Sequence, residues 1–430
     1  MIRSCVLIVF LTIYCLPLLS QRWLGPRDAQ ISGTVLDEND TPISAQIALY
    51  QFIVHDGRLV VMLGCATSAG AMGNFLCQHL RPGAYLIVAT QLRETRQRNK
   101  QSSTVMTHAL PLFVRYPAIP DIGYSDLIHL TDNDAESVIV QANSDLLTTL
   151  SVLSRPDRPT SLVVSIEAAN VNIPIYTSTH QNPGGYFTLQ HLPYGTYHLT
   201  EHWTADDHWR ESVGTVNADG VQSAATTLVD AGPYGVTGSV QYLHDTVQKS
   251  SEIFLTSANP RNAVRYAATV KKDGNFRFRS IPGGSYYLSF ALGSGSYIES
   301  VSEGGQSLVG NELTITDTTS QSPLTITATP AMGVIAGSLE LQGDEAAPGV
   351  VLEAPSLHAF LLVHVSSSGR FRIVGLPPTD YRLYGWADTY AVPYRDEIFE
   401  RRNSDKATDV DLETGTTSSD ISIECSEPAL

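Results

Sequence analysis

The fold is decided by a stretch that reads GNFRFRSIPGGSYYL and covers residues 274–288. A glycine stands two positions before Phe276, Ile281 follows that phenylalanine by five positions, and Tyr286 comes five positions later. Glycine and proline favour chain reversals, while Phe276 and Phe278 alternate with arginines as in a half-buried strand. The stretch therefore predicts a turn, a strand, a second tight turn and a second strand.

The same spacing occurs four times. Each copy has Gly-x-Phe, an aliphatic residue five positions after the phenylalanine, and a tyrosine five positions further on. The sets are Gly73, Phe75, Leu80 and Tyr85; Gly185, Phe187, Leu192 and Tyr197; Gly274, Phe276, Ile281 and Tyr286; and Gly369, Phe371, Leu376 and Tyr381. The copies lie about 90 to 110 residues apart, which is too long for a solenoid repeat and suits small sandwich domains.

A second motif, [IV]-x-Gly-[ST]-[VL], precedes three of the copies, at residues 31–35, 236–240 and 335–339. Its alternating apolar positions predict the first strand of each domain. In the second copy, Leu150-Ser151-Val152 stands where the others have Gly-[ST]-[VL]. We expect the twelve Phe, aliphatic and Tyr anchors to be structural, with each tyrosine hydroxyl bonding back to the preceding turn as in a tyrosine corner.

These motifs resemble the carboxypeptidase regulatory-like domain, a transthyretin-like β-sandwich that is grouped with starch-binding-like carbohydrate modules. The resemblance rests on ISGTVLDENDTPI at residues 31–43, then Gly-x-Phe and Leu-x-Pro-Gly-x-Tyr, and it covers most of the chain. The closing run around Trp386 looks like the last module of bacterial exported proteins built from such repeats. The resemblance implies an all-β chain of four tandem Greek-key, transthyretin-like sandwiches.

The repeat sets the expected domain boundaries. A signal peptide takes residues 1–20, and the first sandwich with a less regular extension takes residues 21–134. The second, third and fourth sandwiches follow at residues 135–232, 233–330 and 331–430. The junctions carry no Ser/Gly linker, so we expect a semi-rigid string of domains.

The N-terminus predicts export. Arg3 precedes an apolar run over residues 5–16, and Ser20 is a small residue near the end of the segment, as in a secretory signal peptide. A buried strand or a membrane anchor is the alternative interpretation, although a membrane span needs ~20 apolar residues. We therefore expect a periplasmic, outer-membrane-associated or extracellular protein without an integral membrane segment after cleavage.

The composition of the chain limits the classes of molecule that we expect it to bind. Only 16% of the residues are charged and the formal net charge is −16, so the surface repels nucleic acid. A hydrophobic content of 43% supports folded cores. A polysaccharide or a cell-surface protein is the expected partner.

Two cysteines flank the loop that contains Gly70 and Gly73. If Thr67 pairs with Phe75 in a hairpin, the same register brings Cys65 opposite Cys77, where a disulfide can form in an oxidising compartment. Two small buried thiols are the alternative.

The stretch EHWTADDHWR, at residues 201–210, is the candidate ligand-binding loop. Sugar rings stack on exposed aromatic faces, so Trp203 and Trp209 could hold a glycan while Asp206 and His208 bond its hydroxyls. The alternative is that Trp203 packs at the end of its sandwich, because Trp386 occupies nearly the same place after the tyrosine of the fourth copy.

Catalytic chemistry is not indicated. The spacing of His208 and Glu211 matches the His-x-x-Glu of zinc carboxypeptidases, but no catalytic α/β domain surrounds it. We expect no enzyme activity, no metal and no cofactor. The sequence predicts a non-catalytic exported protein that binds a carbohydrate or another surface molecule. The alternatives are a structural spacer or assembly subunit of the cell envelope and, third, a metallopeptidase accessory protein.

Overall fold

The computed structural model describes most of the chain after residue 27. The described residues are 28–91, 95–96, 105–106, 112–116, 123, 126–141, 147–153, 160–169, 171–178, 186–205, 208–218, 224–243, 252–258, 264–316, 322–343 and 347–426. The predicted signal peptide at residues 1–20 lies outside them.

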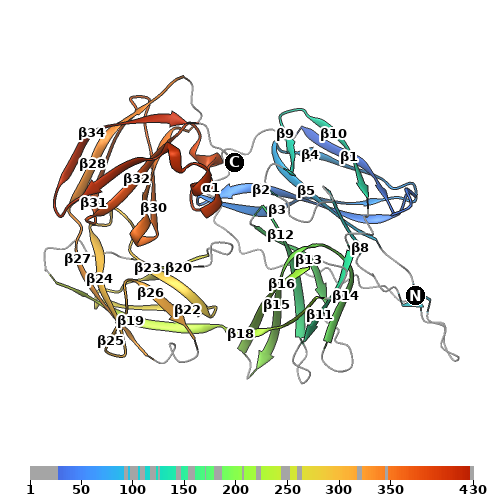
Figure 1. Ribbon diagram of the computed structural model, residues 1–430, viewed down its shortest axis with the longest axis horizontal. Coiled ribbons are helices and arrows are strands. Elements are labelled where there is room, and N and C mark those ends of the chain that lie inside the picture. The colour runs from blue at the N-terminus through green and yellow to red at the C-terminus, as the bar shows by residue number, and fades with distance from the viewer. Residues whose placement is uncertain are drawn as a thin grey trace.

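The strands form four consecutive units, each built from facing sheets, which confirms an all-β chain of sandwiches (Figure 1). One sheet of the first unit has the order β10-β1-β4. Its strands are β1 (Ala29–Leu36), β4 (Asn74–Leu80) and β10 (Ala135–Gln141). The other sheet, of order β3-β2-β5-β8, contains β2 (Ala45–His55), β3 (Arg58–Ala69), β5 (Gly83–Gln91) and β8 (Leu112–Tyr116), and β9 (Ile128–Leu130) also pairs with β5.

The first unit ends later than expected. Strand β10 runs parallel to β1, with Gly33 opposite Val138. Residues 135–141 therefore belong to the first sandwich, and a boundary at residue 134 would remove the edge strand β10 from its sheet. The extension before β10 includes a two-stranded ribbon of β6 (Thr95–Arg96) and β7 (Val105–Met106).

The second unit repeats this plan. Its smaller sheet, of order β14-β11-β17, consists of β11 (Leu147–Leu153), β14 (Tyr186–Pro193) and β17 (Ala224–Thr227). Its larger sheet, of order β13-β12-β15-β16-β18, consists of β12 (Thr160–Ala168), β13 (Val171–Ser178), β15 (Gly195–Ala205), β16 (His208–Ala218) and β18 (Val229–Gly232). A cis peptide bond between Gly232 and Pro233 leads to the third unit.

The third unit has sheets of order β22-β19-β27-β24-β25 and β21-β20-β23-β26. The first contains β19 (Tyr234–Tyr242), β22 (Asn275–Ile281), β24 (Ser296–Glu303), β25 (Gln306–Ser307) and β27 (Leu324–Pro330). The second contains β20 (Glu252–Ser257), β21 (Arg265–Thr269), β23 (Gly284–Ser289) and β26 (Glu312–Ile315).

In the fourth unit one strand joins both sheets. Strand β34 (Thr417–Ser426) pairs with β28 (Gly333–Glu340) and also with β32 (Thr379–Trp386), giving the order β30-β29-β32-β34-β28-β31. The other strands are β29 (Gly349–Ala354), β30 (Ala359–His364), β31 (Arg370–Leu376) and β33 (Thr408–Leu412). Short helices η6 (Pro355–Leu357), η7 (Thr389–Ala391), α1 (Glu397–Arg402) and η8 (Ser404–Lys406) connect them.

The repeated residues fill the interiors. All four aliphatic anchors and all four tyrosines are buried, as are Phe75, Phe276 and Phe371. The burial of Phe187 lies outside the description. Each tyrosine hydroxyl donates to the carbonyl oxygen four residues earlier: Tyr85 to Arg81 at 2.7 Å, Tyr286 to Pro282 at 2.9 Å, Tyr381 to Pro377 at 2.7 Å, and Tyr197 to Pro193. The expected tyrosine corners are thus present in all four units.

The glycine of the first strand makes room for the phenylalanine. Gly33 lies opposite Phe75, and a Cβ at Gly33 would come within 2.8 Å of that ring. In the second unit Val152, and not Leu150, lies opposite Phe187. The sequence alignment of Leu150 with these glycines is therefore wrong by two positions, because Leu150 takes the place of Ile31.

Neighbouring units pack against each other in two pairs. Phe52, Leu86 and Val88, on β2 and β5, belong to the same apolar cluster as the interior of the second unit, and the Tyr50 hydroxyl donates to the Pro174 carbonyl at 2.9 Å. Between the third and fourth units, Leu292 enters the core of the fourth. The rings of Tyr287 and His358 also stack there, with centroids 3.6 Å apart.

The first and fourth units also meet, so the chain is not the string of domains that the short junctions predict. The tip of the β2–β3 hairpin reaches the segment before α1, where the Arg395 amide donates to the Gly57 carbonyl at 2.7 Å (Figure 1). A Cβ at Gly57, whose φ is +69°, would lie 2.4 Å from the Tyr394 ring. The four units consequently close into a ring.

Candidate functional site

The tryptophan-rich stretch is a β-hairpin and not the loop that its polar residues suggest. Strands β15 and β16 continue to Ala205 and from His208, and the register pairs Trp203 with Arg210 and Thr204 with Trp209. Asp206 lies outside the described residues. For Trp203, His208 and Trp209 the structure describes the backbone alone.

Strand alternation assigns the two tryptophans to opposite faces of their sheet. Trp203 continues the series of Tyr197, Leu199 and Glu201, all buried. Trp209, opposite Thr204, belongs to the face that carries His202. The two tryptophans therefore occupy register positions on opposite faces, and glycan binding by Trp203, Trp209, His208 and Asp206 stays a prediction.

Trp386 of the fourth unit corresponds to His202 of the second unit, one residue before Trp203. In the fourth unit Gly349 pairs with Trp386, and the corresponding pair in the second unit is Ser161 with His202. Trp386 is buried on the outer face of its sheet, in a cluster with Tyr384 and Phe399. Its burial therefore carries no information about Trp203.

The two residues of the His-x-x-Glu spacing both lie in β16. His208 and Glu211 lie in the same strand three positions apart, and an odd spacing puts two residues on opposite faces of a sheet. His198 and Glu201 have the same spacing in β15, where His198 Nε2 contacts Glu167 Oε2 at 3.2 Å. No group of three or more His, Cys, Asp or Glu side chains among the described residues is arranged to hold a metal ion.

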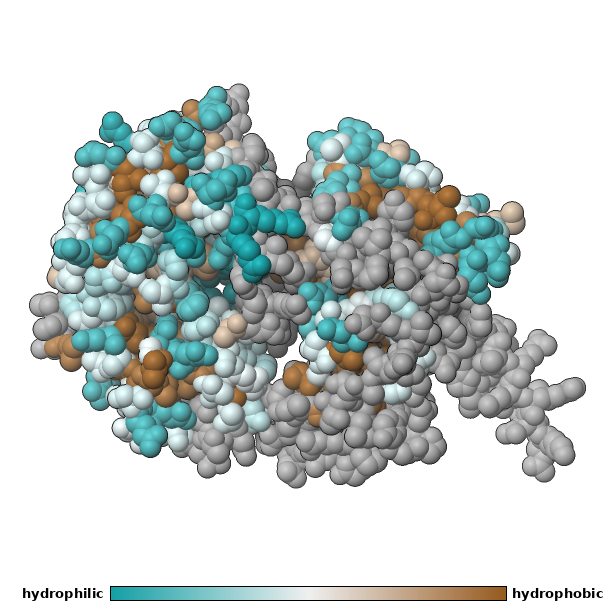
Figure 2. All heavy atoms as spheres, viewed as in Figure 1, coloured by the Kyte–Doolittle hydropathy of each residue, from teal (hydrophilic) through white to brown (hydrophobic). Residues whose placement is uncertain are grey.

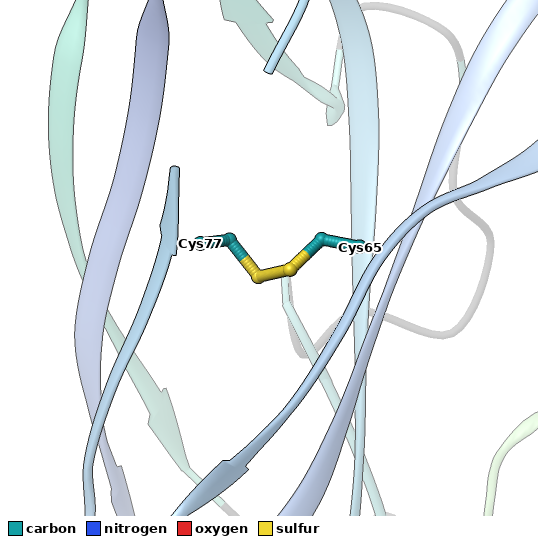
Figure 3. Close-up of a disulfide and its surroundings, with 2 residues drawn as sticks. All are labelled: Cys65 and Cys77. Carbon is teal, nitrogen blue, oxygen red and sulfur yellow. A yellow bond between two sulfur atoms is a disulfide. The ribbon is translucent and has the colours of Figure 1, made fainter. Parts of the chain in front are cut away.

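Cys65 and Cys77 form a disulfide with a Cα–Cα distance of 6.2 Å (Figure 3). The bond does not follow from hairpin register, because β3 pairs with β2 while β4 pairs with β1. It connects the two sheets of the first sandwich, so the expected pairing of Thr67 with Phe75 is wrong. Cys425 remains a thiol.

The surface of the first unit exposes several apolar side chains (Figure 2). Met62 and Leu63 are both exposed on β3, the terminal strand of its sheet. They pair with Gln51 and Tyr50, so they belong to opposite faces of the strand, and the register shift that leaves Gly64 unpaired follows them. Met72 and Leu76, on the following turn and β4, are 71% and 46% exposed. We call these four residues the apolar edge.

The fourth unit buries a carboxyl group on its outer face. Tyr384 donates a hydrogen bond to Glu353 Oε2 at 3.1 Å, and Arg382 Nη1 lies 3.8 Å from Oε1. Burial raises the pKa of Glu353, while the hydrogen bond from Tyr384 and the charge of Arg382 oppose that rise. Nothing in the spacing of these residues had indicated this cluster.

Three arginines from three different units, Arg58, Arg265 and Arg395, also gather where the ring closes. Sequence reasoning missed them, because they are more than a hundred residues apart and share no motif. In the part of the chain that the structure describes, no helix is long and apolar enough to cross a bilayer.

No protein-family profile matches the sequence, and no curated protein matches it. Among solved structures, the chain is similar to the TIE protein of Bacillus anthracis, with 11% identity and a TM-score of 0.18 over 90% of this chain and 68% of that one. A streptococcal ancillary pilin gives 12% identity and a TM-score of 0.19 over 69% of this chain and 98% of its own. The minor pilin GBS52 of Streptococcus agalactiae gives 11% identity and a TM-score of 0.20 over 47% of this chain and 95% of its own. TM-scores this low do not establish a common arrangement of units.

Proposed function

We propose that the protein is a non-catalytic, exported assembly subunit of the cell envelope, built from the carboxypeptidase regulatory-like sandwiches that its repeats resemble. The proposal rests on one observation, which is that the repeated side chains serve the interior of the sandwiches. The repeated aliphatic residues and tyrosines and three of the repeated phenylalanines fill the cores, and the tyrosine hydroxyls bond to backbone carbonyls. What the repeats specify is a set of sandwiches, and contacts such as Tyr50 to Pro174 hold these against one another.

Export is supported by the disulfide. Bonds such as Cys65–Cys77 persist in oxidising compartments and are rare in a reducing cytosol. The signal-like sequence of residues 1–20 points the same way.

The apolar edge is the surface on which we expect a second envelope protein to bind. Met62 and Leu63 lie on a terminal strand, whose outward backbone groups can pair with another chain.

Cross-linking in cells tests this assignment. A photo-reactive amino acid at Leu63 should capture a defined envelope protein, whereas the same group at Arg279, exposed on β22 of the third unit, should not. Equal capture at both positions, or recovery of the mature protein from the cytosol, would contradict the proposal.

Glycan binding is the second candidate, and the hairpin geometry favours one face for it. Trp209 shares its sheet face with His202 and His198, whereas Trp203 continues a buried series. We therefore expect a sugar to contact Trp209. On a glycan array Trp209→Ala should abolish binding and Trp203→Phe should preserve it, and the absence of Trp209-dependent binding would reject this candidate.

A further inference from the structure

The closure of the ring brings together cationic side chains from three units. Arg58 follows the tip of the β2–β3 hairpin, Arg265 begins β21 in the third unit, and Arg395 precedes α1 in the fourth. The hairpin is fixed against the fourth unit by the bond from the Arg395 amide to the Gly57 carbonyl. The positions of the guanidinium groups thus depend on the closed ring.

Aromatic rings hold two of these guanidinium groups. The Arg265 guanidinium carbon lies 3.5 Å above the centre of the Phe254 ring. That of Arg395 lies 5.7 Å from the Phe360 ring centre and 5.5 Å from that of Tyr394. A guanidinium that stacks on a ring keeps its N–H groups in its own plane, available to an acceptor at its edge.

The three arginines repel one another. Burial, then the positive charge of Arg395, lowers the pKa of Arg58 to about 10 and that of Arg265 to about 10. Two carboxylates oppose this repulsion, Asp56 at both arginines and Glu252 at Arg265, together with the hydroxyl of Tyr394. Among the described residues, three positive charges therefore face two negative ones.

Two of the guanidinium groups also have N–H groups that find no acceptor among the described residues. Asp56 Oδ1 lies 3.8 Å from Arg395 Nη2, beyond hydrogen-bond distance, and the Asp56 side chain is 59% exposed. The Arg395 side chain is only 8% exposed. The Nε groups of Arg58 and Arg395 are buried without a hydrogen-bond partner among the described residues. A buried donor without an acceptor is costly, so a negatively charged acceptor would stabilise the described part of the junction.

We propose that this junction binds a tetrahedral oxyanion, phosphate or sulfate, between the guanidinium groups of Arg58, Arg265 and Arg395. Oxygen atoms of such an ion match the planar fork of a guanidinium and would accept from the unpaired Nε groups. The bound anion would also hold the first, third and fourth units together. The inference is independent of the partner proposed for the apolar edge.

Calorimetry with the full chain tests the site. Titrated with inorganic sulfate or phosphate in a chloride buffer of constant ionic strength, the protein should bind one anion with a dissociation constant below about 1 mM. Arg58→Gln, Arg265→Gln and Arg395→Gln should each weaken binding by about tenfold or more. Arg279→Gln, which removes an exposed arginine of the third unit, should leave binding unchanged.

Conservative variants separate the site from misfolding. Arg58→Lys keeps the charge and loses the fork, so its affinity should lie between those of the wild type and Arg58→Gln. The unfolding midpoint of the wild type should rise with sulfate, and that of Arg265→Gln should rise less.

The source of the anion is distinguished by a parallel titration with dextran sulfate. Binding of both ligands indicates a site open to sulfate esters, and binding of free sulfate alone indicates an enclosed ion; either result supports the site if the arginine variants lose it. Absence of saturable binding up to about 10 mM, or equal weakening in Arg279→Gln, would overturn the proposal.

Discussion

Gly238 and Phe276 lie directly opposite each other on β19 and β22, and a Cβ at Gly238 would come within 2.6 Å of the phenylalanine ring. The Leu324 carbonyl oxygen on the neighbouring strand is equally close to that position. The absence of a side chain thus lets the aromatic anchor cross the first strand of the unit.

Gly238→Ala should therefore destabilise the protein, by about 1 to 3 kcal/mol, because the ring and a strand backbone would both have to shift. Denaturant unfolding of the full chain measures the change. Gly70→Ala is the matched control, since no atom lies within 4 Å of a Cβ there. Equal effects of the two changes would show that the ring contact is unimportant.

Removal of a single tyrosine hydroxyl should weaken the fourth unit. Tyr381→Phe leaves the buried ring in place and deprives the Pro377 carbonyl of its donor, at a cost of about 1 kcal/mol. Tyr390→Phe removes a hydroxyl from a residue that is 51% exposed and should change stability little. Thermal unfolding of both variants provides the comparison, and an unchanged Tyr381→Phe midpoint would argue against the corner as a stabilising element.

Loss of the disulfide should lower stability by roughly 3 kcal/mol, as expected for a bond that closes a short loop in the unfolded chain. The double substitution Cys65→Ser with Cys77→Ser tests this in unfolding experiments, with Cys425→Ser as the control. A reductant should destabilise the wild type and leave the double variant unaffected. A wild type whose stability does not change with the reductant would mean that the two thiols are unpaired in solution.

Stability should depend on the protonation of Glu353. Burial raises its pKa above the ordinary value of 4.5, so the folded state binds this proton more tightly than the unfolded chain does. The stabilising contribution is complete below pH 4.5 and is lost as the pH rises through the raised pKa. Urea unfolding between about pH 4 and pH 8 should show this loss in the wild type and a flatter profile in Glu353→Gln. Identical pH profiles would exclude the effect.

Local spacing predicted the interior of each unit. The tyrosine corners of Tyr85, Tyr197, Tyr286 and Tyr381 depend on a donor and an acceptor four residues apart, so their geometry is contained in a short segment. The same holds for the aliphatic anchors, which follow strand alternation.

Pairing between distant segments was harder to predict. The hairpin of residues 201–210 resembled a loop because aromatic and polar residues alternate on both of its faces, which hides the apolar periodicity. The partner of Cys65 was predicted correctly from a wrong premise, since a hairpin and an inter-sheet crossing both bring two cysteines within bonding distance. The gathering of Arg58, Arg265 and Arg395 depends on how whole units pack, and no local pattern encodes that.

Ring closure has a consequence for the order of events during synthesis. The carbonyl of Gly57 accepts its bond from the Arg395 amide, so the chain must be translated beyond residue 395 before the hairpin finds the surface that donates this bond. If the units fold one after another during synthesis, the hairpin tip stays exposed until the segment around Arg395 has been made. A chain released before residue 395 would keep that tip exposed, because the segment that covers it would be missing.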